Sequence, residues 1–175
     1  AMIVRACPSL RRRSLLTAAA ALSLPAWATS PAAGPLVEVW KSPSCGCCGA
    51  WVEHMRQNGF QVSTHDVVDV PAERKKLGMP ERLGSCHSAK VGGYVIEGHV
   101  PAADIRRLLK EKPKARGLAV PGLPRGSPGR ELSNPFCETA CTILDNAGQE
   151  RDIRRERYDT LLVGPDGKTS IFARH

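Results

Sequence analysis

Aromatic residues are scarce in this chain of 175 residues, and acidic residues are absent from its N-terminal segment. Phe, Trp and Tyr make up only 5% of the chain, so it has no stripe of interleaved basic and aromatic side chains for stacking on nucleic-acid bases. The first 28 residues contain four arginines and no Asp or Glu, and leaving these arginines out lowers the net charge from +8 to +4. Elsewhere Lys and Arg alternate with Asp and Glu, so the charge pattern does not indicate nucleic-acid binding.

The chain also lacks an apolar run long enough to cross a membrane. The longest candidate, Leu15 to Leu24, has about half of the roughly 20 residues that a spanning helix needs. The charged run Arg11 to Arg13 precedes it, and Ala26 to Ala28 follows it as a small-x-small cleavage signal. This pattern predicts a signal peptide over residues 1–28, removed on export to the periplasm together with Cys7. The arginine run also fits a twin-arginine signal, so both export routes stay open.

The remaining chain has the composition of one globular domain, with 42% hydrophobic and 24% charged residues overall. A Pro/Ala/Gly linker over 29–35 leads into a domain over 36–175. Alternating and helical spacings predict strands at 36–40, 60–67 and 90–98, helices at 45–58, 71–77 and from Pro101, and a hairpin of 158–163 with 168–172. This order of elements predicts an α/β fold, a thioredoxin-like sandwich with a central mixed sheet flanked by helices.

Six cysteines remain after removal of the signal peptide. An even number in an oxidising compartment raises the possibility of a disulfide framework. Three of them, Cys45, Cys47 and Cys48, lie within four residues. Disulfides need specific Cα separations and converging side chains, so this crowding argues against such a framework. A metal ion accepts crowded sulfur ligands readily.

The cysteine cluster lies where a predicted strand passes into a predicted helix. Unpaired N–H groups at a helix start favour thiolate over thiol, so these sulfurs should be good metal ligands and nucleophiles. Three soft sulfurs suit copper, as Cu(I), or zinc, and thiolates can bridge several copper ions.

A second group of candidate ligands follows at Cys86, His87 and His99. Each lies beside glycine or at the end of a predicted element, and Cys86-His87 offers a sulfur and a nitrogen together. By contrast, His54 is opposite the apolar stripe of its predicted helix, and His65 lies in a polar-alternating strand. These two histidines are predicted to be solvated surface residues.

Four segments resemble the CopG-type periplasmic copper-resistance proteins. They read SPSCGCCGAWVEHM, GSCHSAKVGGYVIEGHVPAADIRRLL, GLAVPGLPRGSPGRE and YDTLLVGPDGKTSIFARH. The resemblance implies a thioredoxin-like fold and copper held in a cysteine-bridged multinuclear cluster, with a part in copper redox interconversion. It also implies the ligands Cys45, Cys47, Cys48, Cys86, His87 and His99. The family's usual methionines are replaced here by Leu123 and Arg130, so any thioether contact from those positions is absent.

Residues 133–157 look like an insertion relative to this family. Helical spacing after Ser133-Asn134-Pro135 predicts a helix that places Cys137 and Cys141 one turn apart. Cβ atoms at that spacing are about 5 to 6 Å apart, which disfavours an unstrained disulfide within a helix. The pair could add copper donors, pack the helix as small apolar residues, or form a bridge by unwinding it.

Two other functions compete with copper binding in copper resistance or homeostasis. Cys45 and Cys48 form a C-x-x-C at a helix start, which is typical of thiol-disulfide oxidoreductases. A third cysteine at Cys47 would disturb such a dithiol cycle. A structural zinc or iron–sulfur site would use similar ligands. The sequence leaves enzymatic activity, such as copper oxidoreduction, open. The expected partners are copper ions and other periplasmic copper-handling proteins, with no nucleic acid and no membrane span in the mature chain.

Overall fold

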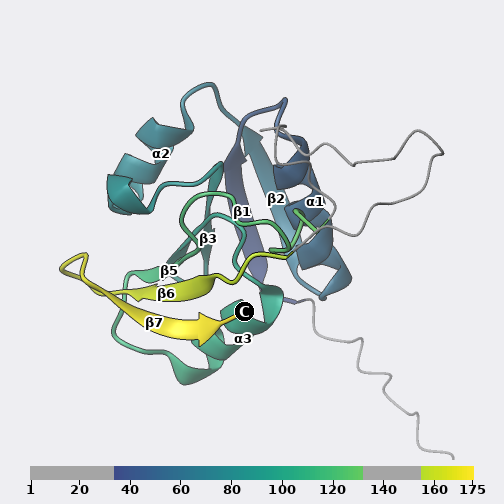
Figure 1. Cartoon of the computed structure of the whole chain (residues 1–175). Coiled ribbons are helices and arrows are strands. Elements are labelled where there is room, and N and C mark those ends of the chain that lie inside the picture. The colour runs from purple at the N-terminus through teal and green to yellow at the C-terminus, as the bar shows by residue number, and fades with distance from the viewer. Residues whose placement is uncertain (1–33, 132–154) are drawn as a thin grey trace, which may run out of the picture. The chain divides into compact units, whose positions relative to one another are not determined.

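The computed structural model describes residues 34–131 and 155–175 (Figure 1). Its strands are β1 (Leu36–Lys41), β2 (Gln61–Asp66), β3 (His87–Val91), β4 (Tyr94–Glu97), β5 (Gly117–Ala119), β6 (Asp159–Val163) and β7 (Thr169–Arg174). Its helices are α1 (Gly46–Gln57), α2 (Val70–Lys76) and α3 (Ala102–Glu111), with a single 3₁₀ turn at Glu81–Leu83. The predicted α/β class is therefore confirmed.

The strands form one mixed sheet in the order β2-β1-β3-β4-β5-β6-β7. β1 pairs with β2 in parallel, as β4 does with β5, and the other neighbouring pairs are antiparallel. The strand β3 lies between β1 and β4. This order brings the start of β3 beside the end of β1, with His87 opposite Lys41 in the register.

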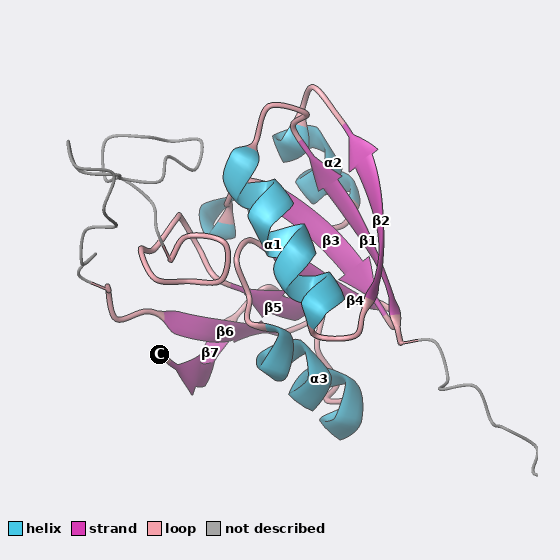
Figure 2. Cartoon of the chain, turned by 90° about the vertical axis from the view of Figure 1, so that its right-hand side faces the viewer, coloured by secondary structure: helices cyan, strands magenta, loops and turns pink. Residues whose placement is uncertain are grey.

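Two hydrophobic clusters lie on the two faces of the sheet. Figure 2 shows α1 and α3 on the near face of the sheet and α2 beyond it. Along β4, Ile96 joins the larger cluster with Trp51 of α1 and Ile105 of α3, whereas the adjacent Val95 joins a smaller one with Met79. Alternate residues of a strand face opposite sides of a sheet, so one strand contributes to both clusters.

The helix α1 begins at the cysteine cluster because Cys45 caps it. The Sγ of Cys45 accepts a hydrogen bond from the backbone N–H of Cys48, which satisfies one of the free donors of the first turn. Trp51, Val52 and Met55 form the buried face of the helix, and Asn58 ends it. Burial of that face fixes the direction of the helix and therefore the position of its first turn. None of the helices in the described part of the chain is long and apolar enough to cross a membrane.

The strand predicted at 90–98 is wrong in its extent. The structure has two antiparallel strands there, β3 and β4, joined by Gly92 and Gly93, whose φ angles are +55° and +87°. Left-handed backbone at two consecutive residues is what a tight hairpin turn requires, and glycine adopts it without steric cost. The other predicted strands and helices are present within one or two residues of their expected ends. The short strand β5 and the 3₁₀ turn were not predicted, and the insertion over 133–157 lies almost entirely outside the described residues.

Candidate metal centre

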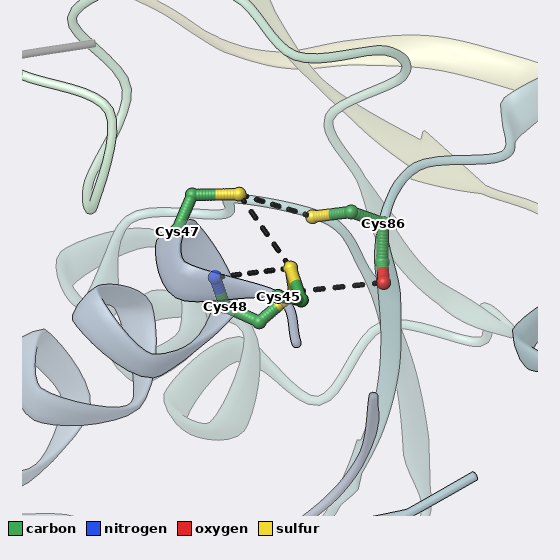
Figure 3. A group of neighbouring side chains, drawn as sticks. All are labelled: Cys45, Cys47, Cys48 and Cys86. Carbon is green, nitrogen blue, oxygen red and sulfur yellow. Dashed lines mark hydrogen bonds between the residues drawn. A yellow bond between two sulfur atoms is a disulfide. The ribbon is translucent and has the colours of Figure 1, made fainter. Parts of the chain in front are cut away.

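Four cysteine sulfurs meet between the start of α1 and the segment that precedes β3. Sγ of Cys47 lies 3.6 Å from Sγ of Cys45 and 3.8 Å from Sγ of Cys86. In Figure 3, dashed lines join Sγ of Cys47 to the sulfurs of Cys45 and Cys86, and Sγ of Cys48 to the carbonyl oxygen of Cys86. The sulfurs of all four cysteines lie within 4.8 Å of one another. The structure thus brings Cys86 to the cluster that the sequence places at residues 45–48.

A disulfide joins Cys45 to Cys48, and Cys47 and Cys86 are free cysteines. This finding corrects the expectation that crowding in this segment disfavours disulfides. Cys45 is the capping residue and Cys48 lies three residues later, so one helical turn brings their Cα atoms to 5.3 Å. That separation lies within the range of about 4.4 to 6.8 Å found for disulfides. Cys47 points elsewhere on the turn and takes no part.

Two buried histidines extend the site on the side of Cys86. Nε2 of His99 lies 3.0 Å from Sγ of Cys86, and Nδ1 of His87 lies 3.4 Å from the same sulfur. The rings of His87 and His99 meet edge to face, 5.0 Å apart. Both residues are fully buried. Cys86, His87 and His99 therefore form a second group of possible ligands that shares one sulfur with the first.

The tautomer of His99 is fixed by a hydrogen bond on its far side. Nδ1 lies 2.7 Å from the carbonyl oxygen of Pro128. A carbonyl oxygen only accepts, so Nδ1 must carry a proton and donate it. In a neutral ring the lone pair is therefore on Nε2, the nitrogen nearest Cys86. Metal-binding histidines are commonly oriented in this way by a carbonyl group behind them.

His87 is buried as a neutral ring. Burial lowers its pKa well below the usual range, and the neighbouring His99 acts in the same direction. Its Nε2 has no hydrogen-bond partner among the described residues. An unpartnered polar nitrogen in the interior is costly. Cysteine sulfurs and imidazole nitrogens are the donors that soft and borderline metals prefer, so these residues fit a copper or zinc ion.

The two free cysteines share one proton. The hydrogen bond with Cys86 lowers the pKa of the Cys47 thiol to about 4, although burial opposes this. The same bond and burial raise the pKa of Cys86. At neutral pH, Cys47 is therefore a thiolate and Cys86 a thiol that donates to it. His99 and, more weakly, Arg130 also lower the pKa of Cys47. Arg130 itself is 5% exposed.

A buried ion pair fixes the residue before Cys86. Nε of Arg74 lies 2.7 Å from Oε1 of Glu97, and both side chains are buried. The backbone N–H of Ser85 donates to Glu97 at 2.7 Å, and the carbonyl of Ser85 accepts from Arg74 at 2.6 Å. Ser88 donates to the other oxygen of Glu97 at 2.5 Å. Ser85 and Ser88, which flank Cys86 and His87, are therefore both hydrogen-bonded to Glu97. Glu97 itself lies two residues before His99.

This ion pair was missed by the sequence analysis. A signal was present for Glu97, which is a carboxylate in the otherwise apolar strand YVIE directly before Gly98 and His99. No signal marks Arg74 as its partner, because Arg74 lies in a charged stretch of α2 beside the exposed Lys75 and Lys76.

The remaining histidines lie away from the sulfurs. His65 is exposed, as predicted, and stacks on Trp40. The prediction of a solvated His54 is wrong, because its ring is half-buried and its Nε2 accepts a hydrogen bond from the backbone N–H of Ala102. His54 thus caps the start of α3, and burial lowers its pKa. The candidate ligands Cys137 and Cys141 lie outside the described residues.

One protein family and two solved structures match this chain. A family described as "Protein of unknown function, DUF411" matches residues 83–130, which include Cys86, His87 and His99. Two solved structures, "Copper resistance protein copG- Form 2" and "Copper resistance protein copG- Form 1", are 34% and 35% identical to this chain. The match to Form 2 covers 81% of this chain and 98% of the solved chain, with a TM-score of 0.66. The match to Form 1 covers 80% of this chain and 96% of the solved chain, with a TM-score of 0.65. The chain belongs to the CopG copper-resistance family. Among curated proteins, none matches it.

Membership of the CopG family agrees with the chemistry of the residues that meet in the structure. The segment matched by the family model carries Cys86, His87 and His99, whereas Cys45, Cys47 and Cys48 precede it. A cysteine cluster able to hold metal, in a member of this family, supports a role in copper resistance.

Proposed function

We propose that this protein binds copper for copper resistance, using Cys45, Cys47, Cys48, Cys86, His87 and His99 as ligands. The observation that carries the proposal is the meeting of four sulfurs and two imidazoles from three separate segments of the chain. No purely structural need explains this convergence. The buried Cys47 and the two buried imidazoles would be replaced at lower energetic cost by apolar side chains.

The sulfur separations support a shared metal. Two thiolates bound at the zinc distance of about 2.3 Å, with angles between tetrahedral and trigonal, lie roughly 3.8 to 4.0 Å apart. Cys47 and Cys86 are 3.8 Å apart, and Cys45 and Cys47 are 3.6 Å apart. The thiolates favour Cu(I) over the harder ions, which makes copper the preferred metal and zinc the weaker candidate.

A multinuclear copper site would use all six donors of the reduced protein. One Cu(I) ion needs fewer ligands than this, and thiolates can bridge neighbouring ions. Imidazole suits Cu(II) and thiolate suits Cu(I), so a mixed donor set would let the site change between the two oxidation states. Copper redox interconversion is therefore part of the proposal.

The test is replacement of Cys45, Cys47 and Cys48 together by serine. Copper binding should be abolished while the fold persists, because serine is close to cysteine in size and is itself a preferred capping residue at the position of Cys45. The matched control is His65→Ala, which removes an exposed imidazole and should leave the copper content unchanged. If the triple variant held copper with the affinity of the original protein, the proposal would be wrong.

A thiol-disulfide oxidoreductase is the second candidate, because Cys45 and Cys48 form a disulfide at the start of α1. Against it, the free Cys47 lies 3.6 Å from Cys45 and would compete in any dithiol cycle. Offering the reduced protein copper and zinc together separates the candidates. Retained copper supports copper binding, retained zinc supports a structural zinc site, and reduction of insulin disulfides without metal supports the oxidoreductase.

The proposed place of action is the periplasm, after removal of residues 1–28 as a signal peptide. The partners would be copper ions and other copper-handling proteins of that compartment. Expression in a Gram-negative host followed by fractionation and N-terminal sequencing tests this point. A periplasmic chain beginning near Thr29 is the expected result, and an uncleaved cytoplasmic chain would contradict it.

The inserted segment adds a separate proposal, that Cys137 and Cys141 are additional copper donors. The copper count of the Cys137→Ser, Cys141→Ser double variant should be lower than that of the original protein. Alkylation and mass spectrometry of the copper-loaded protein provide the second measurement. A disulfide between the two, or an unchanged copper count and spectrum in the variant, would contradict the proposal.

A further inference from the structure

The Cys45–Cys48 disulfide divides the candidate ligands into two classes. Disulfide sulfurs carry no thiolate charge, so Cys45 and Cys48 are poor donors in this form. Cys47 and Cys86 remain free. The oxidised protein therefore keeps part of the donor set rather than losing all of it.

We infer that the disulfide form of this protein retains a site for one Cu(I) ion, formed by Cys47, Cys86 and His99, and that reduction of Cys45–Cys48 enlarges this site to hold more copper. The inference rests on the proposed copper-binding function and specifies how much of it each thiol state provides. The six proposed ligands do not by themselves define how many copper ions bind, and the inference gives that number for each thiol state.

The geometry of the remaining donors supports a site for one ion. The sulfurs of Cys47 and Cys86 are 3.8 Å apart, close to the spacing of two thiolates on one metal. Nε2 of His99 lies 3.0 Å from Sγ of Cys86, the sulfur that the cysteine group shares with the histidine group. Two soft sulfurs and one imidazole thus converge from α1, from the segment before β3 and from the end of β4. Three ligands of this kind satisfy a Cu(I) ion.

His99 is better prepared than His87 to be the nitrogen ligand of this site. Its Nδ1 donates to Pro128, so Nε2, the nitrogen nearest Cys86, is the one left to bind a metal ion. Of the four sulfurs, His87 contacts only that of Cys86, at 3.4 Å. His87 would become a ligand when the enlarged site of the reduced protein binds a second copper ion.

The change between the two forms is a balanced two-electron step. Reduction of the Cys45–Cys48 bond takes up two electrons and two protons and yields two thiols. With a water-soluble trialkylphosphine as reductant, the phosphine supplies the two electrons and one water molecule supplies the two protons. The oxygen of that water ends in the phosphine oxide. On binding further Cu(I), the two new thiols lose their protons to solvent and become ligands.

The experiment counts Cu(I) in both forms of the full chain. All proteins carry Cys7→Ser, Cys137→Ser and Cys141→Ser, so that only the four clustered cysteines contribute. Anaerobic Cu(I) is titrated against a chromophoric Cu(I) chelator, and the disulfide is confirmed by alkylation and mass spectrometry. The expected result is one tightly held Cu(I) per chain in the disulfide form and at least two after phosphine treatment. X-ray absorption of the disulfide form should give two sulfurs and one nitrogen.

Variants separate the two parts of the site. Cys45→Ser with Cys48→Ser should hold one Cu(I) whether or not phosphine is added. Cys47→Ser with Cys86→Ser should hold none in the disulfide form. His99→Ala removes a ligand and should weaken the single ion by more than the roughly ten- to a hundredfold found when only the support of a metal ligand is lost. The control His65→Ala should leave both counts unchanged.

The outcomes distinguish this inference from the proposed function. A disulfide form without Cu(I), beside a reduced form that binds it, would overturn the inference and leave the function in place. Loss of the single ion in the Cys45→Ser, Cys48→Ser variant would also overturn it. Absence of tight Cu(I) in both forms would refute the proposed function itself.

Discussion

Arg74 and Glu97 form a buried ion pair in which Nε and Oε1 are 2.7 Å apart, and the pair holds Ser85 by both its N–H and its carbonyl group. Ser85 precedes Cys86, and Glu97 lies two residues before His99. The ion pair thus connects the two segments that deliver a sulfur and an imidazole to the metal centre, although neither charged residue is a candidate ligand. We regard both as positioning residues.

Glu97→Gln should destabilise the protein and weaken copper binding together. Removing one partner of a buried ion pair leaves an uncompensated charge, which costs about 3 to 5 kcal/mol. Loss of the bonds to Ser85 should also lower Cu(I) affinity roughly ten- to a hundredfold. Urea unfolding and chelator competition measure the two effects. The control is Glu73→Gln, which breaks an exposed pair with Lys76 and should cost less than about 1 kcal/mol. Equal costs for the two variants would contradict this account.

The stability of the metal-free protein should fall as the pH is lowered below about 6.5. Burial lowers the pKa of His87 in the folded protein, so in this range the unfolded chain takes up a proton that the folded chain does not. This contribution to stability is complete above the pKa of His87 in the unfolded chain. It is lost as the pH falls towards the lower pKa of His87 in the folded protein. One such group changes the free energy of unfolding by at most about 1.4 kcal/mol per pH unit.

His87→Gln should therefore make the pH dependence shallower. Urea unfolding at several pH values between 5 and 7, in the presence of a metal chelator, provides the measurement. His54, whose pKa burial also lowers, should retain a smaller dependence in the variant. The exposed residue His65 provides the control variant His65→Gln. An unchanged slope for His87→Gln would show that this ring is not buried as a neutral group.

Replacing His87 or His99 by alanine should reshape the copper site without abolishing it. The thiolates provide most of the affinity for Cu(I), whereas imidazole better suits Cu(II). The spectroscopic change should therefore be larger in the oxidised, copper-loaded form than in the reduced form. Absorption and electron paramagnetic resonance spectra in both states test this. Identical spectra for a variant and the original protein in both states would remove that histidine from the ligand set.

Gly98→Ala should destabilise the protein more than Gly93→Ala. Both glycines have a left-handed backbone, with φ of +72° and +87°. A Cβ atom at Gly98 would also lie 2.5 Å from the carbonyl oxygen of Val120 and 2.6 Å from the Cβ of Ser85, whereas one at Gly93 would contact nothing. The cost of about 1 to 3 kcal/mol for a left-handed backbone is common to both variants. The difference between their free energies of unfolding therefore measures the steric contact of the new Cβ atom with Val120 and Ser85, beside Cys86 and His99. Urea unfolding measures it, and equal costs would be the contradicting result.

The residue pattern by itself determined most of the secondary structure and most of the candidate ligands. Alternation and helical spacing are local properties, and they located β1, α1, β2, α2, α3 and the final hairpin within one or two residues. The pattern failed at Gly92-Gly93 because a short apolar run with two glycines reads equally as one weakened strand or as a hairpin. Clustered cysteines and glycine-flanked histidines indicated metal binding because few other roles require those residue types at that spacing.

Only the tertiary structure decided which of these residues meet and in what state. The order of the strands brings Cys86, 39 residues from Cys47, to 3.8 Å from its sulfur. The turn geometry at the start of α1 joins Cys45 to Cys48 and leaves Cys47 free. Burial and neighbours then give each group its protonation state: a thiolate at Cys47 and a neutral ring at His87. Such effects depend on distance in space and on loss of solvent, and neither of these is a property of spacing along the chain.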